Sequence, residues 1–224
     1  MEPSTLLSGI IELLRVIIWP LVVVFILVFF KDPIGGFLGN MRKSSIKVGK
    51  EGVAVELDAT KAEVVSMLGA ANTASGKESN QVDWGKIAQA ANSLNQTNIK
   101  KLSEASVLWV DDNPDNNTYE RRALSALGIN FMLSRSTDDA IQKIKYNKYD
   151  IVISDMGRGD DKTAGFKLLE AKQKLNDSSP FIIYSWGVSK DKIEMAKAKG
   201  AFGETSLPQE LFQLVIDAIQ GKQS

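Results

Sequence analysis

Short apolar runs and amphipathic stretches alternate along the second half of the chain. The stretches between the runs repeat apolar residues at the three- and four-residue spacing of an amphipathic helix. This alternation predicts a doubly wound α/β domain with a parallel sheet. The expected strands are Val107–Val110, Asn130–Leu133, Ile151–Ser154, Phe181–Tyr184 and Ala201–Thr205, and the expected helices are Tyr119–Leu127, Asp138–Tyr146, Phe166–Leu175, Lys190–Lys199 and Gln209–Ile219.

Polar side chains follow three of the expected strands. Asp111 and Asp112 follow the first strand, Asp155 follows the third and Ser185 follows the fourth. Because the carboxyl ends of parallel strands meet at one edge of a sheet, we expect these side chains to share a crevice. Clustered carboxylates repel one another unless a hard cation lies among them, and oxygen ligands suit magnesium. The alternative is a solvated strand edge that binds nothing.

The first part of the chain is dominated by one apolar segment, Leu6–Phe30, in which Glu12 and Arg15 are the only charges. Its length of about 25 residues gives roughly 37 Å of helix, which is enough to cross a bilayer. It lacks the basic start, short apolar core and small-residue cleavage site of a secretory signal. We therefore predict an uncleaved, single-pass transmembrane anchor over residues 1–31.

The distribution of basic residues predicts the orientation of this anchor. No Lys or Arg precedes the span, and several follow it, which favours an inner-membrane protein with its C-terminal domain in the cytoplasm. Glu12 and Arg15 lie one helical turn apart. They either pair locally and reach toward the interface, or face a polar interface between copies or a pore. The basic residues after the span are Lys31, Arg42, Lys43, Lys47 and Lys50.

The sequence pattern of residues 32–104 predicts a small α+β linker region between the anchor and the α/β domain. Alternating apolar and polar residues in Ser45–Gly49 and Gly52–Leu57 predict a juxtamembrane hairpin. Asp58 is expected to cap a helix that runs to about Asn72, and a second helix is expected from Asp83. We interpret this region as a spacer that holds copies together.

The amino-acid composition excludes several kinds of catalytic and metal-binding site. The chain has no Cys and no His, which excludes disulfides, the usual zinc sites and thiol or Ser-His catalysis. Its 27 basic and 27 acidic residues balance, so there is no overall electrostatic footprint for nucleic acid. Any chemistry is therefore expected from carboxylates.

An ordered set of motifs over roughly residues 105–221 resembles the receiver domain of bacterial two-component response regulators. The set consists of VDDNP at residues 110–114, the D-x-V-x-x-D run from Asp150 to Asp155, Gly165 followed by Leu168-Leu169, Pro180 with FIIYS, and Gly200-Ala201 before Leu207-Pro208.

The resemblance implies a flavodoxin-like (βα)5 fold for residues 105–224. It also implies a phosphoacceptor at Asp155 and a phosphoryl-contacting hydroxyl at Ser185. Mg²⁺ would be held by Asp111, Asp112, Asp155 and the carbonyl of Gly157.

Two departures from the family pattern indicate a degenerate receiver. Leu207 stands where the family has a lysine that neutralises the phosphoryl oxygens, and leucine has no charge to do so. Glu204 or Thr205 stands at the aromatic switch position. Arg158 or Lys162, in a long charged loop after Asp155, is a candidate to replace the missing cation.

The expected function is signalling through protein–protein interaction. No domain-sized segment follows the last expected helix, so we expect no DNA-binding or catalytic output domain and no enzyme activity on other molecules. The expected partners are a cytoplasmic protein or sensor kinase and the membrane, not nucleic acid. Trp186 and Phe202 are candidate contacts for a partner or a second copy, the alternative being ordinary packing.

Two other functions remain open. One is an oligomeric membrane effector, for example in bacterial defence, whose receiver-like domain is a sensor and whose transmembrane helices perturb the membrane. The other is an enzyme acting on phosphoryl groups. The enzyme is the weaker alternative, because the only catalysis that the motifs imply is self-phosphorylation and self-hydrolysis.

Overall fold

The computed structural model describes residues 50–76 and 82–221. The chain divides into two compact units, Met1–Gly52 and Val53–Ser224. The predicted anchor over residues 1–31 and the first strand of the predicted hairpin lie outside the described residues. Among the residues that are described, no helix is both long and apolar enough to cross a membrane. The anchor therefore stays a prediction.

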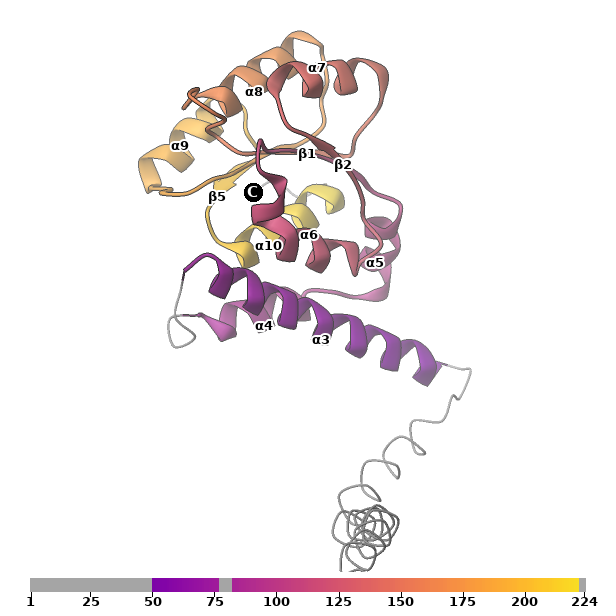
Figure 1. Cartoon of the computed structure of the whole chain (residues 1–224). Helices are drawn as coiled ribbons and strands as arrows, with labels where there is room; N and C mark the ends of the chain where they lie inside the picture. The colour runs from indigo at the N-terminus through magenta and orange to yellow at the C-terminus, as the bar shows by residue number, and fades with distance from the viewer. Residues whose placement is uncertain (1–49, 77–81, 222–224) are drawn as a thin grey trace, which may run out of the picture. The chain divides into compact units, whose positions relative to one another are not determined.

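Five parallel strands form the centre of the second unit (Figure 1). Their order is β2-β1-β3-β4-β5, and Val110 at the end of β1 lies opposite Ser134 of β2 and Ser154 of β3. This order is that of flavodoxin-like folds and confirms the predicted α/β class. The strands are β1 (Ser106–Val110), β2 (Asn130–Ser134), β3 (Ile151–Ser154), β4 (Phe181–Tyr184) and β5 (Gly203–Thr205).

Helices cover both faces of the sheet, with α7, α8 and α9 on one face and α6 and α10 on the other (Figure 1). The alternation of side chains along β1 matches these two faces. Val107 and Trp109 belong to the core on the α10 side, and Leu108 and Val110 to the core on the α8 side. The helices of this part are α6 (Thr118–Ser125), α7 (Thr137–Tyr146), α8 (Ala164–Lys174), α9 (Lys190–Ala198) and α10 (Pro208–Gln220), and a 3-10 helix, η2 (Pro114–Asn117), precedes α6.

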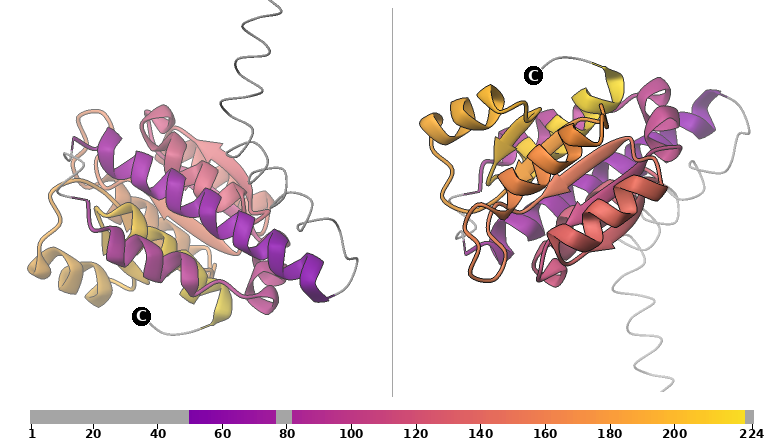
Figure 2. Two further views of the ribbon diagram at one scale, coloured as in Figure 1. Left: turned by 90° about the horizontal axis from the view of Figure 1, so that it is seen from below. Right: turned by 90° about the horizontal axis from the view of Figure 1, so that it is seen from above.

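Three further helices, α3 (Lys50–Ala74), α4 (Trp84–Asn92) and α5 (Gln96–Ser103), precede the sheet. They lie on the side of α6 and α10, where they form an additional layer (Figure 2). Their buried side chains join one core with the sheet, which includes Leu68 of α3 and Phe212 of α10. The Asp83 carboxylate accepts a hydrogen bond from the backbone N–H of Lys86 at 3.0 Å, so α4 begins where the sequence predicted.

The predicted hairpin is wrong in its second strand, because Gly52–Leu57 lies within α3. A six-residue alternation of apolar residues does not separate a strand from a helix. Val53, Leu57, Val64 and Leu68 also fit a helical stripe, and Leu57, Val64 and Leu68 pack in the core. A helix can bury this stripe in the core that it shares with α4, α5, α6, α10 and the sheet, whereas a lone hairpin is only marginally stable in water. Consequently Asp58 is interior to α3 and is not a cap.

Candidate functional site

A cleft of about 350 Å³ lies at the carboxyl ends of the strands. It is lined by Asp111 and Asp112 after β1, Asp155 after β3 and Ser185 after β4. β1 and β3 are neighbours in the sheet although β2 lies between them in the chain, so the cleft opens at the point where the strand order reverses. The structure therefore brings together four of the five residues that the sequence predicted for the site.

Asp111 is the most enclosed of the three aspartates, with 7 % of its surface exposed. Its Oδ1 accepts a hydrogen bond from the backbone N–H of Asn113 at 2.7 Å, and its Oδ2 accepts one from Nδ2 of Asn117 at 2.6 Å. Burial raises the pKa of Asp111, and the neighbouring Asp112 raises it further, while the Asn113 and Asn117 donors oppose the shift.

Asp155 is the candidate phosphoacceptor. Its backbone N–H donates to the Val110 carbonyl at 2.9 Å, which ties the residue to β1, and its Oδ1 accepts from the backbone N–H of Met156 at 2.8 Å. Burial, reinforced by the charge of Asp111, raises the pKa of Asp155 from 3.8 to about 6. The cleft thus holds two carboxyl groups whose ionised forms are disfavoured at the same place.

The remaining predicted metal ligands are placed less favourably. Asp112 is exposed, and its Oδ2 accepts from the backbone N–H of Gly159 at 2.8 Å. Gly157 lines a neighbouring groove and not this cleft. Within residues 50–76 and 82–221, no group of three or more acidic side chains is arranged to hold a metal ion.

Ser185 follows β4, and its hydroxyl lies on the β5 side of the cleft. The backbone N–H of Ser185 donates to the Thr205 carbonyl at 3.1 Å, and its Oγ donates to Oε1 of Glu204 at 3.4 Å. Glu204 therefore occupies the place next to the hydroxyl, whereas Thr205 is engaged with Glu210 at 2.7 Å. Of the two candidates for the aromatic switch position, Glu204 is the one whose side chain contacts the Ser185 hydroxyl.

Leu207, at the position of the family lysine, is the residue before α10. It is half-buried, and its backbone N–H donates to Oγ1 of Thr205 at 3.0 Å. Ser206 lines the cleft after β5, and Leu207 does not.

Arg158 lies close to the acidic cluster, as the sequence suggested for a replacement cation. Its buried guanidinium donates from Nη1 to Oγ of Ser154 and to the backbone oxygen of Asp155, both at 2.7 Å, and from Nη2 to Oγ1 of Thr137 at 2.9 Å. Burial lowers the pKa of Arg158, and the charge of Asp155 counteracts this. The guanidinium thus binds the main chain at Asp155 and fixes the loop after β3. Lys162 lines the neighbouring groove.

Glu120 and Tyr184 form a buried pair in the cleft wall that sequence reasoning missed. The Tyr184 hydroxyl donates to Oε1 of Glu120 at 2.8 Å, and Oε2 of Glu120 has no hydrogen-bond partner among the described residues. Burial raises the pKa of Glu120. The signal was present, because Glu120 precedes Ala123, Leu124 and Leu127 at helical spacing and so belongs to the buried face of α6.

The end of α3 forms another part of the cleft that the sequence did not indicate. Ala71, Ala74 and Ser75 line it together with the aspartates. One turn of this helix is also tied to the start of α10, because Nδ2 of Asn72 donates to Oε1 of Gln209 at 2.9 Å, with both residues buried. The helix before the sheet domain therefore borders the candidate phosphorylation site directly.

No protein-family model and no curated protein matches the sequence. Solved structures of receiver domains are similar to about half of the chain. They include a two-component response regulator from Clostridium difficile (22 % identity, 53 % of this chain and 97 % of that one, TM-score 0.46). Another is the signal receiver domain of a putative Luxo repressor protein from Vibrio parahaemolyticus (22 %, 52 % and 91 %, TM-score 0.47). At these values the similarity does not determine an activity.

Proposed function

We propose that this chain is a membrane-anchored, receiver-like signalling protein that acts through protein–protein interaction and is modulated by Mg²⁺ and by phosphorylation at Asp155. The observation that carries the proposal is the pairing of Asp155 with Asp111 across the point where the strand order reverses. Burial raises the pKa of both carboxyl groups, and the charge of Asp112 reinforces the rise at Asp111 as that of Asp111 does at Asp155. A site of this kind is stabilised by any cation or covalent change that removes negative charge.

The groups that line the cleft are of the kind that a hard divalent cation takes, although in the described residues no three acidic side chains are arranged around one ion position. The candidate ligands are oxygens only, and the inaccessible Oε2 of Glu120 is an additional acceptor in the cleft wall that has no partner among the described residues. Asp111 and Asp155 would hold the ion, with Asp112 and the Gly157 carbonyl joining after a change of side chain and loop. When bound, Mg²⁺ would neutralise the carboxylates and the oxygens of an incoming phosphoryl group.

The absence of the family lysine calls for a different readout. Leu207 has no charge that could bind the phosphoryl group. It therefore cannot couple phosphorylation to a movement of β5 as a lysine would. The contacts of α3 offer another route. Ala71, Ala74 and Ser75 line the cleft, and Asn72 binds Gln209 two residues after Leu207. We infer that a change of charge in the cleft is transmitted to α3, and from there to the segment before it.

The test is an amide NMR titration of the Val53–Ser224 unit with Mg²⁺ and then beryllofluoride, which mimics an aspartyl phosphate. We expect shifts at Asp111 and Ser185 and also along Ala71–Ser75 of α3. Asp155→Ala removes the acceptor and should abolish the beryllofluoride shifts, whereas Asp160→Ala, which removes an exposed acid of the adjacent loop, should keep them.

Absence of beryllofluoride shifts at millimolar Mg²⁺ would reject phosphorylation at Asp155. Shifts at Asp111 and Ser185 without any in α3 would reject the proposed transmission route but not the site.

Membrane attachment is tested separately, because it depends on residues 1–31. We expect the full chain to sediment with the inner membrane and to resist extraction at high salt and high pH, and a chain that begins at residue 50 to remain in the supernatant. A partner, such as a sensor kinase, is expected to be cytoplasmic. Recovery of the full chain in the soluble fraction would reject the anchor.

A further inference from the structure

A second hollow of about 590 Å³ lies beside the acidic cleft, between the loop after β3, the start of α8, the loop after β4, and α9. Its volume is within the range of roughly 300–1,000 Å³ that is usual for small-molecule sites. Asp155 and Ser185 border both hollows, so the two meet at these residues. Most of the surface of this groove is formed by side chains that the proposed phosphorylation does not use.

Glu204 forms the inner end of the groove and has an unsatisfied acceptor. Only 4 % of the residue is exposed, and burial raises the pKa of its carboxyl group. Oε1 accepts from Ser185, but Oε2 has no hydrogen-bond partner among the described residues. An unpaired buried oxygen is unfavourable. Because this oxygen is closed off from solvent, a ligand that shifts the Glu204 side chain and donates an N–H to it would supply the missing hydrogen bond.

The walls of the groove are apolar and unusually exposed. Trp186 is 72 % exposed and Met195 is 51 % exposed, and Met156 and Phe166 line the opposite part. An indole ring left in water beside a groove offers a flat face on which another aromatic ring can stack. This accounts for Trp186 better than ordinary packing does, since little of its ring is buried in the structure.

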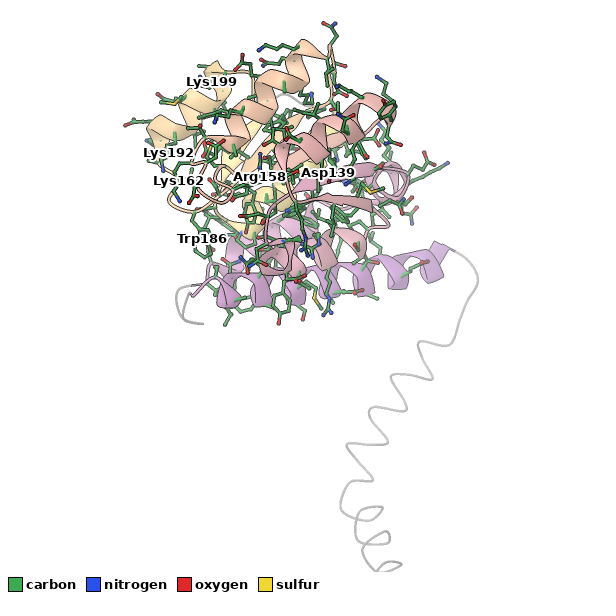
Figure 3. The ribbon with its side chains drawn as sticks, turned by 45° about the horizontal axis from the view of Figure 1, so that its top comes forward. Asp139, Arg158, Lys162, Trp186, Lys192 and Lys199 are labelled. Atoms are coloured by element: carbon green, nitrogen blue, oxygen red, sulfur yellow. The ribbon has the colours of Figure 1, made fainter. Side chains whose placement is uncertain are left out.

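Two lysines border the groove from different elements, Lys162 from the loop after β3 and Lys192 from α9. Figure 3 shows them on the same flank of the molecule, with Trp186 nearby. Nζ of Lys192 donates to the Gly187 carbonyl at 2.8 Å, which leaves two of its hydrogens for a ligand. Together the lysines favour an anionic group beside them, and the charge of Lys192 also opposes the rise in the pKa of Glu204.

We propose that this groove binds a nucleoside monophosphate. The base stacks on Trp186 and donates an N–H to Oε2 of Glu204, and the phosphate lies between Lys162 and Lys192. A nucleotide combines the three features that the groove calls for, which are a flat ring, an N–H donor on that ring and an anionic group. Purine nucleotides are favoured, because the larger ring covers more of the apolar wall.

The test is isothermal titration calorimetry of the full chain with guanosine monophosphate, and with guanosine and ribose 5-phosphate as the two halves of the ligand. We expect the nucleotide to bind at least about tenfold more tightly than either half. Trp186→Ala should weaken nucleotide binding by at least about fivefold, and Glu204→Leu by about tenfold. Lys162→Ala should weaken binding of the nucleotide and leave that of guanosine unchanged.

Tyr146→Ala is the matched control for the loss of an aromatic ring, because Tyr146 is 82 % exposed and does not line the groove. It should bind the nucleotide as the unmodified chain does. Glu204→Leu removes a buried carboxyl group and should fold at least as well as the parent, which a thermal melt verifies. No binding at millimolar nucleotide would overturn the proposal. So would equal binding of ribose 5-phosphate, or binding that both Trp186→Ala and Glu204→Leu leave unchanged.

Discussion

Replacing Asp155 with Asn should stabilise the protein at neutral pH when no divalent cation is present. The substitution keeps the shape of the side chain and leaves an oxygen that can accept from the backbone N–H of Met156, as Oδ1 of Asp155 does. It removes the negative charge that burial and Asp111 disfavour. The perturbation therefore isolates the electrostatic cost of the acidic cleft.

The size of the expected stabilisation follows from the pKa of Asp155. A rise from 3.8 to about 6 corresponds to about 3 kcal/mol, at about 1.4 kcal/mol for each tenfold change. Because Asp155 is partly exposed, solvent screening reduces this to about 1–2 kcal/mol. The folded state binds the proton more tightly than the unfolded state. The destabilisation by ionised Asp155 therefore reaches its full value above about pH 6, where the residue is ionised in both states. It disappears below about pH 4, where the residue is protonated in both.

The assay is urea unfolding of the Val53–Ser224 unit in the presence of a chelator, for the parent and for Asp155→Asn. The variant should be more stable by about 1–2 kcal/mol near pH 7, and the difference should vanish near pH 4. Added Mg²⁺ should stabilise the parent more than the variant. A variant that is less stable near pH 7, or a difference that does not change with pH, would refute the electrostatic reasoning.

Two further substitutions test the cleft wall and the packing of α8 against Asp155. Tyr184→Phe removes the hydroxyl that donates to Oε1 of Glu120, whose Oε2 already has no partner among the described residues, and should lower the free energy of unfolding by about 1–3 kcal/mol; an unchanged urea midpoint would contradict it, and Glu120→Leu in the same chain should restore most of the loss. Gly165→Ala places a Cβ 2.9 Å from the backbone oxygen of Asp155 and 3.0 Å from Cα of Met156. It should cost about 1–3 kcal/mol despite the better helix propensity of alanine and weaken the beryllofluoride response, and a variant as stable and responsive as the parent would count against it.

The sheet domain was predictable because β1, β3, β4 and β5 are buried on both faces and its helices are amphipathic. Strand limits were correct at β3 and β4, where continuous apolar runs are bounded by polar residues. β5 was expected from Ala201 but begins at Gly203. The second strand of the hairpin, Gly52–Leu57, was wrong for the opposite reason. Its apolar residues suit a strand and a helix equally, and only the core formed with the other helices and the sheet decides between them.

The candidate site was predictable to the extent that it lies at strand ends. Asp111, Asp155 and Ser185 could be placed from the chain order alone, since parallel strands end at one edge. Contacts that depend on long-range packing could not. The approach of α3 to the cleft, and the choice of Glu204 over Thr205 as the neighbour of Ser185, become visible only when helices and strands are placed together.

α3 is one uninterrupted helix of 25 residues, a rod roughly 37 Å long. Its last turn borders the acidic cleft, and its first residue, Lys50, continues directly from the N-terminal segment of the chain. A rotation or pull applied at Lys50 therefore meets no loop that could absorb it before it reaches the aspartates. If the cleft binds Mg²⁺ as proposed, linkage is reciprocal: tension on the N-terminal segment should change the affinity for Mg²⁺ as much as bound Mg²⁺ changes the position of the helix.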